Sequence, residues 1–152
     1  MSTAEEVELA PEVLGIIDHV GLAVPDLDVA IAFHTDILGL RLVHREDNPD
    51  QGVAEAMLAA PGSGPDTAQV QLIAPLNAES ILTRFLDRSG PGLQHLAFRV
   101  NDVDQAADLL RERGLRLLYE AARPGTRGCR INFVHPKDAG GVLLELVEPA
   151  AV

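Results

Sequence analysis

The feature that most constrains this sequence is an internal repeat that covers most of the chain. The segment DHVGLAVPDLDVAIAF at residues 18–33 aligns without a gap with QHLAFRVNDVDQAADL at residues 94–109. The alignment pairs His19 with His95 at a spacing of 76 residues. Towards the ends of the two copies the spacing falls to 74, as small loop deletions would produce. We therefore expect one structural unit that occurs twice.

Each copy has the pattern of a strand, a helix and three further strands. Short runs of β-branched and apolar residues predict the first strands at 16–24 and 93–100, and an Asp that can cap a helix follows each run. Apolar residues at three- and four-residue spacing then predict a helix, which ends at Gly39 or Gly114. The remaining strands are expected at 40–46, 52–60, 68–74, 115–120, 128–134 and 142–147.

This pattern predicts an α+β fold in which two tandem βαβββ modules form one curved mixed sheet around a metal-binding cup. The first module is expected at about 15–76 and the second at about 91–149, with a linker helix at about 77–90. Residues 1–14 are acidic and are expected to form a flexible tail, which leaves 15–152 as a single domain.

Charge and hydropathy exclude several classes of function. The formal net charge of −11 argues against a nucleic-acid partner, because binding to phosphate backbones depends on cationic side chains. No apolar stretch approaches the ~18 residues that a membrane span requires, so no membrane partner is expected. The N-terminus lacks the basic and apolar regions of a secretory signal, which predicts a cytoplasmic location. A single cysteine, Cys129, excludes an internal disulfide framework.

Four polar residues occupy matching places in the two copies and predict a metal site. His19 and His95 lie in the first strands, and Gln71 and Glu145 lie in the last strands, each within an apolar run. If first and last strands are neighbours in each module, all four side chains can converge where the modules meet. These donors suit a divalent ion, and the residues alone leave Co²⁺, Mn²⁺, Ni²⁺, Zn²⁺ and Fe²⁺ open.

Two further features leave alternatives open. Strand alternation places Glu55 on the same face as Val53 and Met57, where it could be a buried proton acceptor, although an edge-strand acid facing water fits equally well. Arg123, Arg127, Arg130 and Lys137 cluster in one stretch, which could bind a small anion or form ordinary solvated surface.

Several segments of the chain, among them IDHVGLAVPDLDVAIAFHTDILGL, QVQLIAPLNAES and GLQHLAFRVNDVD, resemble the methylmalonyl-CoA epimerase family of the vicinal oxygen chelate superfamily. The resemblance runs from about residue 16 to 149, and its most specific pieces are REDNPDQGVAE and HPKDAGGVLLEL. It implies a metal-dependent isomerase of propionate metabolism that interconverts the R and S epimers of methylmalonyl-CoA. The expected reaction removes and returns the α-proton through a metal-stabilised enolate. The resemblance also implies an acyl-CoA substrate and a homodimer.

The resemblance implies roles for particular residues. A divalent ion is expected, Co²⁺ in the first place and Mn²⁺, Ni²⁺ or Zn²⁺ as alternatives, with the ligands His19, Gln71, His95 and Glu145. Glu55 is the implied catalytic base, and Glu145 is the implied second acid-base group. The phosphates of coenzyme A are expected on Arg127, Arg130 and Lys137.

Other functions use the same type of cup. A glyoxalase-type isomerase would act on a glutathione adduct, and an extradiol dioxygenase would bind Fe²⁺ through two histidines and one carboxylate, which leaves Gln71 unexplained. A non-catalytic ligand-binding protein of the superfamily would be expected to have lost His19, His95 or Glu145. All three residues are present in this sequence.

Overall fold

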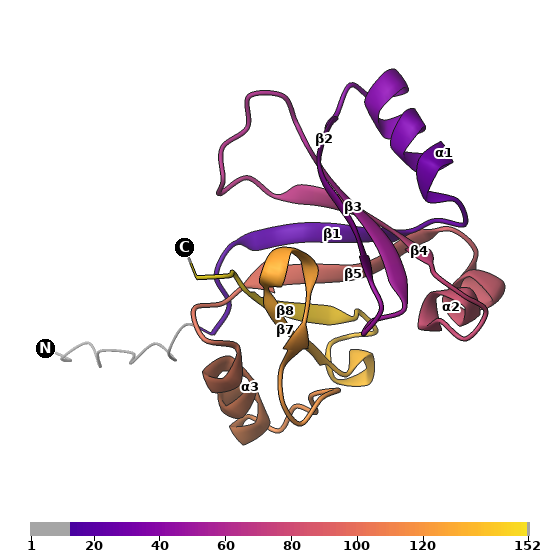
Figure 1. Ribbon diagram of the computed structural model, residues 1–152. Coiled ribbons are helices and arrows are strands. Elements are labelled where there is room, and N and C mark those ends of the chain that lie inside the picture. The colour runs from indigo at the N-terminus through magenta and orange to yellow at the C-terminus, as the bar shows by residue number, and fades with distance from the viewer. Residues whose placement is uncertain (1–12, 152) are drawn as a thin grey trace, which may run out of the picture.

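One mixed sheet of eight strands, in the order β2-β3-β4-β1-β5-β8-β7-β6, forms the body of the protein (Figure 1). The structure is a computed structural model that describes residues 13–151. The strands are β1 (Ile17–Ala23), β2 (Arg41–Asn48), β3 (Val53–Ala59), β4 (Gln69–Pro75), β5 (Gly92–Arg99), β6 (Arg123–Pro124), β7 (Arg130–Val134) and β8 (Leu144–Glu148). The helices are α1 (Leu27–Ala32), which a π-helical turn at Phe33–Ile37 continues, α2 (Ile81–Ser89) and α3 (Val103–Glu112).

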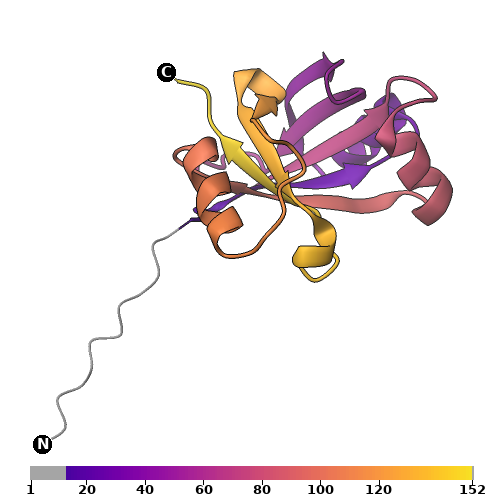
Figure 2. The same ribbon diagram turned by 90° about the horizontal axis from the view of Figure 1, so that it is seen from below.

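The strand order has the same pattern on both sides of its centre. In each module the first strand pairs in parallel with the last, as β1 with β4 and β5 with β8. The two modules join through the antiparallel pair β1 and β5. The expected fold of two tandem βαβββ modules in one curved mixed sheet is confirmed, and Figure 2 shows how the sheet curls.

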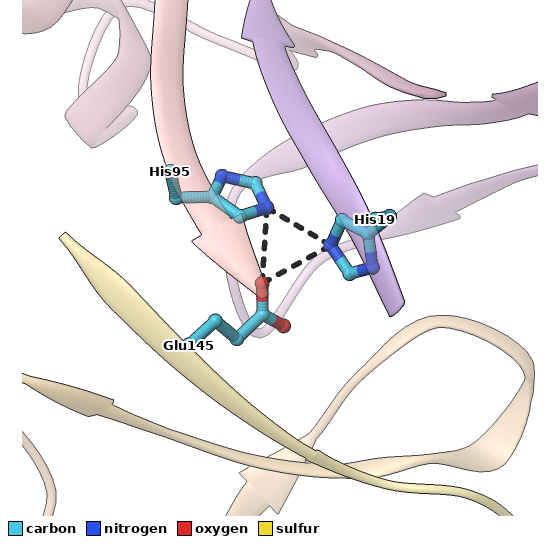
Figure 3. Close-up of side chains that lie close together, drawn as sticks. All are labelled: His19, His95 and Glu145. Atoms are coloured by element: carbon cyan, nitrogen blue, oxygen red, sulfur yellow. Dashed lines mark hydrogen bonds and ion pairs between the residues drawn. The ribbon is translucent and has the colours of Figure 1, made fainter. Parts of the chain in front are cut away.

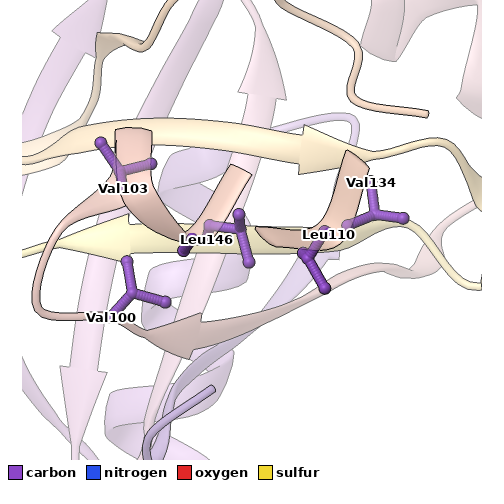
Figure 4. Packing of buried hydrophobic residues seen from close by; sticks show 6 residues of the cluster. Val100, Val103, Leu110, Val134 and Leu146 are labelled. Carbon is purple, nitrogen blue, oxygen red and sulfur yellow. The ribbon is translucent and has the colours of Figure 1, made fainter. Parts of the chain in front are cut away.

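Helices α1 and α3 pack against the outer face of the sheet. In the second module Val103 and Leu110 of α3 pack with Val134 of β7, Leu146 of β8 and Val100 (Figure 4). In the first module α1 covers a matching apolar cluster on β3 and β4. Because side chains alternate along a strand, this packing turns the intervening residues of the same strands into the cup.

The predicted helix ends are confirmed. The side chain of Asp26 accepts a hydrogen bond from the backbone N–H of Val29, and Asp102 accepts from two N–H groups in the first turn of α3. Gly39 and Gly114 follow the helical segments with φ of 76° and 88°, a conformation that residues with a Cβ rarely adopt.

The strand predicted at 115–120 is wrong. Only an isolated bridge between Leu117 and Val134 is present in that segment, and the edge strand β6 comes later and has two residues. The buried side chain of Asn132 explains the difference. It accepts from the N–H of Tyr119 and donates to the carbonyl of Tyr119, so a side chain replaces the backbone ladder at this point. The other predicted strands match within two residues at each end.

The ends of the predicted modules fall between observed elements. Strands β1 to β4 lie within 15–76, α2 lies within 77–90, and β5 to β8 lie within 91–149. Of the tail expected at 1–14, only the last two residues are described, and these pack against the apolar cluster of α3, whereas residues 1–12 lie outside the described part. No helix in the described part is long and apolar enough to cross a bilayer.

Candidate active site

The cup contains a cavity where the two modules meet. Five predicted site residues line this cavity, and they are His19, Glu55, Gln71, His95 and Glu145. Each of the five is buried, with 3–7% of its surface exposed. The structure therefore brings together residues from both halves of the chain and places polar groups where burial is costly without a partner.

Three donor atoms converge at the centre of this cavity (Figure 3). His19 Nε2 of β1 lies 3.0 Å from His95 Nε2 of β5, and Glu145 Oε2 of β8 lies 3.3 Å and 3.0 Å from these two nitrogens. Two donors bound at ~2.1 Å to one ion and at right angles to each other would be about 3.0 Å apart. The donor set and its spacing therefore fit a divalent metal ion.

The fourth expected ligand, Gln71, connects this group to Glu55. The amide nitrogen of Gln71 donates a hydrogen bond of 2.6 Å to Glu55 Oε2, which leaves the amide oxygen of Gln71 available to a cation. The other carboxylate oxygen of Glu55 is buried, and within residues 13–151 it has no hydrogen-bond partner. Glu55 is therefore held in the cavity beside the three donors with one oxygen free.

Burial and neighbouring charges shift the pKa values of Glu145, His19 and Glu55 in the metal-free protein. Burial opposes ionisation of Glu145, but His95 and His19 outweigh it and lower the pKa of Glu145 to about 2. Burial opposes the charge on His19, but Asp18 and Glu145 raise its pKa to about 9. Burial raises the pKa of Glu55 to about 7, although the nearby hydroxyl group of Thr126 opposes this shift. At neutral pH a proton on His19 balances the charge of Glu145, and a bound cation would take the place of this proton.

A glycine makes room for one of the ligands. Gly21 of β1 pairs with His95 across the module joint, and a Cβ at residue 21 would overlap the imidazole ring. Glycine in a strand often marks such a close approach. The sequence GLAV after His19 thus has a role in the site that its apolar character does not reveal.

The polar cavity residues that the sequence does not single out include Asp18, Gln94 and Thr126. Asp18 and Gln94 lie next to the histidines and contact their outer ring nitrogens. They could have been found, because they occupy matching places in the repeat, immediately before His19 and His95. Thr126 also lines the cavity, and no pattern in the sequence indicates it.

The three cationic side chains that were expected to bind the substrate phosphates lie outside the cavity lining. Arg130 forms ion pairs with Asp104 and Glu148, and the guanidinium of Arg127 donates to Gln69 at 3.2 Å. Lys137 lies in a 3₁₀ turn at Pro136–Asp138. Within the described residues, none of the three side chains lines the cavity.

Comparisons with known proteins agree with this geometry. A profile of the glyoxalase/bleomycin resistance protein/dioxygenase superfamily matches residues 18–133. The crystal structure of methylmalonyl-CoA epimerase from Mycobacterium tuberculosis has 57% identity and a TM-score of 0.87, with 95% of each chain covered. A methylmalonyl-CoA epimerase in complex with methylmalonyl-CoA and NH₄⁺ has 43% identity over 91% of this chain and 97% of that one, with a TM-score of 0.85. The ethylmalonyl-CoA/methylmalonyl-CoA epimerase of Cereibacter sphaeroides is 34% identical over 88% of this chain and 97% of its own.

Proposed function

Since this chain belongs to the methylmalonyl-CoA epimerase family of the glyoxalase/bleomycin resistance protein/dioxygenase superfamily, we propose that it interconverts the R and S epimers of methylmalonyl-CoA. It is an isomerase. The observation that carries this conclusion is the buried carboxyl group of Glu55, which lies in one cavity with a cluster of three metal-type donors. This is the combination that removal of a weakly acidic C–H proton requires.

The reaction needs a base that is ionised at neutral pH and still basic enough to accept a proton from carbon. Glu55 meets both needs, because burial raises its pKa above that of a free carboxyl group, while a cation bound beside it would favour the ionised form. The hydrogen bond from Gln71 fixes the orientation of the carboxylate. We assign Glu55 as the base that takes the α-proton.

The ligands that we propose for the divalent ion are His19, Gln71, His95 and Glu145. When bound, this ion would act as a Lewis acid that stabilises negative charge on the substrate's carbonyl oxygens. Gln71 would bind through its amide oxygen, because its amide nitrogen is engaged with Glu55. Nitrogen and oxygen donors suit several divalent ions, and we propose Co²⁺, which the family resemblance implies, with Mn²⁺, Ni²⁺ and Zn²⁺ as alternatives.

Epimerisation also requires a group that returns a proton to the opposite face of the α-carbon. We assign this role to Glu145, whose carboxylate lies in the same cavity and comes from the other module. Because its low pKa leaves Glu145 ionised, it must take up a proton before it can return one to the α-carbon. The two carboxylates thus lie on strands of opposite halves of the cup, β3 and β8. This placement supports attack from two sides of a substrate held between them.

The coenzyme A tail needs a path out of the cavity. A second hollow adjoins it and shares Gln94, His95, Leu118 and Leu143 with the cavity lining. The hollow is also lined by two cations of α2, Arg84 and Arg88, for which the described structure contains no ion pair. We propose that the tail follows this hollow and that its phosphates lie near α2.

The cations expected from the sequence fit this path to different degrees. Lys137 follows Pro136, which lines the second hollow, and Arg127 follows Thr126, which lines the first. Both stay proposed phosphate contacts. Arg130 also stays proposed, but it would have to exchange Asp104 and Glu148 for a phosphate.

We propose that the active form is a cytoplasmic homodimer. The outer side of α1 and its π-helical turn exposes Val29, Phe33 and Ile37 at four-residue spacing, with 67%, 49% and 71% of their surfaces accessible. A row of large apolar side chains on a surface helix supports contact with a second copy. Sedimentation of the wild type beside Phe33→Glu tests this surface, and a monomeric wild type would contradict the dimer.

Solvent deuterium tests the reaction directly. Methylmalonyl-CoA incubated in D₂O with the Co²⁺-supplied protein should gain deuterium at the α-carbon. Glu55→Gln keeps the shape and loses the base, so exchange should fall by roughly 10²–10⁴-fold. Glu112→Gln is the matched control, because Glu112 lies at the exposed end of α3 and does not line the cavity within the described residues. A wild-type protein that gives no exchange would refute the proposal.

A further inference from the structure

Two β-bulges interrupt the pairing of β1 with β5, one on each strand. On β1 a register shift leaves Asp18 as an extra residue immediately before His19. On β5 a second shift leaves Gln94 as an extra residue immediately before His95. A bulge changes the direction of a side chain that regular alternation would turn to the opposite face. The two bulges therefore occupy equivalent places relative to the two ligand histidines.

Each extra residue accepts a hydrogen bond from the histidine that follows it. His19 Nδ1 lies 2.6 Å from Asp18 Oδ2, and His95 Nδ1 lies 2.6 Å from Gln94 Oε1. A carboxylate or amide oxygen can only accept, so each Nδ1 carries the proton. The Nε2 atoms, which lie 3.0 Å from each other, are thereby left to face the metal centre.

The two acceptors differ in charge and in support. Asp18 is an anion, and its second oxygen accepts from Arg99 Nε at 3.2 Å. Arg99 in turn binds Asp66 and the carbonyl of Pro65, in the loop between β3 and β4, at 3.1 Å and 3.0 Å. An ionic chain thus runs from the surface to His19, whereas the acceptor of His95 is a neutral amide.

We propose that Asp18 and Gln94 are positioning residues that fix the ligand tautomer and ring orientation of His19 and His95, and that Asp18 makes His19 the stronger ligand. Groups that accept from the outer nitrogen of a ligand histidine orient it and increase its basicity, and their loss weakens metal binding. Arg99 fixes Asp18 in place. This inference rests on the metal centre of the proposed function.

The experiment measures the dissociation constant for Co²⁺ of the full chain, without substrate, in competition with a chromophoric chelator. Asp18→Ala should raise this constant by about 10- to 100-fold, and Gln94→Ala should raise it by about 10-fold. Asp18→Asn keeps an oxygen acceptor and should recover part of the loss. Gln94→Glu adds the charge that Asp18 supplies on the other side and should tighten binding. The visible absorption bands of Co²⁺ should shift in Asp18→Ala, as a change in ligand orientation requires.

Asp66→Asn is the control. It alters the exposed end of the same ionic chain, where Asp66 has 84% of its side chain accessible, and should change the constant by no more than about threefold. Thermal melting in the presence of a chelator checks that the variants fold. If Asp18→Ala does not fold, the Co²⁺ affinities of Asp18→Asn and Gln94→Ala test the inference. Wild-type affinity in both of these would overturn the inference. So would an Asp66→Asn variant that binds as weakly as Asp18→Ala, or a wild type that binds no Co²⁺. If the ranking holds but the wild type exchanges no α-proton, the proposed reaction is wrong and the positioning roles stand.

Discussion

At the scale of single residues, Glu55 is the most costly group in the cavity. The residue is 3% exposed, and ionisation of its carboxyl group must be compensated by the surroundings. In the metal-free protein that compensation is incomplete, which raises the pKa of Glu55 from its ordinary value of 4.5 to about 7. A group that is unfavourable for the fold and favourable for proton transfer is typical of an active site.

The raised pKa of Glu55 predicts a pH-dependent cost in stability. The folded metal-free protein binds this proton more tightly than the unfolded chain does. The contribution of the protonated Glu55 to the free energy of unfolding is therefore complete below pH 4.5 and is lost as pH rises through about 7. Glu55→Gln stays neutral and should match the wild type at pH ~4.5. At pH ~8 it should be more stable by up to about 3 kcal/mol. Urea unfolding with a chelator present measures this, and an equal difference at both pH values would contradict it.

The raised pKa of His19 predicts that metal binding releases a proton. Below a pKa of about 9 the metal-free site holds a proton on His19, and a cation must displace it. The affinity for Co²⁺ should therefore rise by about tenfold per pH unit up to about 9 and then level off. Calorimetry in buffers of different ionisation enthalpy counts the released proton. An affinity that is flat between pH 6 and 8 would show that His19 is already neutral.

At the scale of elements, the irregular pairing of β1 with β5 shapes the candidate site. These two strands supply both histidines, and their antiparallel pairing contains the two bulges and the close contact of Gly21 with His95. The strands on either side, β4 and β8, add one polar residue each to the cavity, and they pair with their neighbours without a register shift. The shape of the metal centre therefore depends on the central pair more than on any other element.

Substitution of Gly21 tests this dependence. The φ of Gly21 is not in the left-handed region, so alanine fits the backbone, but its Cβ would overlap the ring of His95. Gly21→Ala should displace the ring and weaken Co²⁺ binding by more than about tenfold. Gly64→Ala is the control, because a Cβ there meets nothing within 4 Å. Unchanged affinity in Gly21→Ala would mean that His95 is not a ligand in this orientation.

At the scale of the whole molecule, the cavity lies between the two modules, and a bound cation would connect side chains of both modules. Of the three convergent donors, His19 belongs to the first module, and His95 and Glu145 belong to the second. Without a metal the two halves are joined by β1 and β5, and side-chain contacts such as Tyr119 to Gln51 span the cavity. A ligand that binds only the folded state adds to its stability.

Metal loading should therefore stabilise the whole domain. At a free Co²⁺ concentration about 100 times the dissociation constant, the gain is about 2.7 kcal/mol, which raises Tm by roughly 5–10 °C. His95→Ala should melt at the same temperature with and without Co²⁺ while keeping its circular dichroism spectrum. Differential scanning calorimetry measures both proteins. A Co²⁺-dependent shift of equal size in His95→Ala would contradict the ligand assignment.

The repeat was sufficient to predict the module, because a duplicated pattern of apolar residues, helix-capping aspartates and terminal glycines is a local property of the sequence. It also predicted that His19, Gln71, His95 and Glu145 meet, since equal places in two copies become equal places around the joint. The same logic failed at 115–120. There the buried side chain of Asn132 takes hydrogen bonds that a strand ladder would use, and no local pattern indicates that substitution.

The sequence by itself thus determined the elements, the duplication and the identity of the donors, because periodicity and capping act over a few residues. Only the tertiary structure decided the order of the strands, the bulges that turn Asp18 and Gln94 towards the histidines, and the depth at which Glu55 is buried. These depend on contacts between segments that are 16 to 81 residues apart in the chain, as from Glu55 to Gln71 and from Asp18 to Arg99. Register and burial are set by the partner strand, and the partner is known only once the chain has folded.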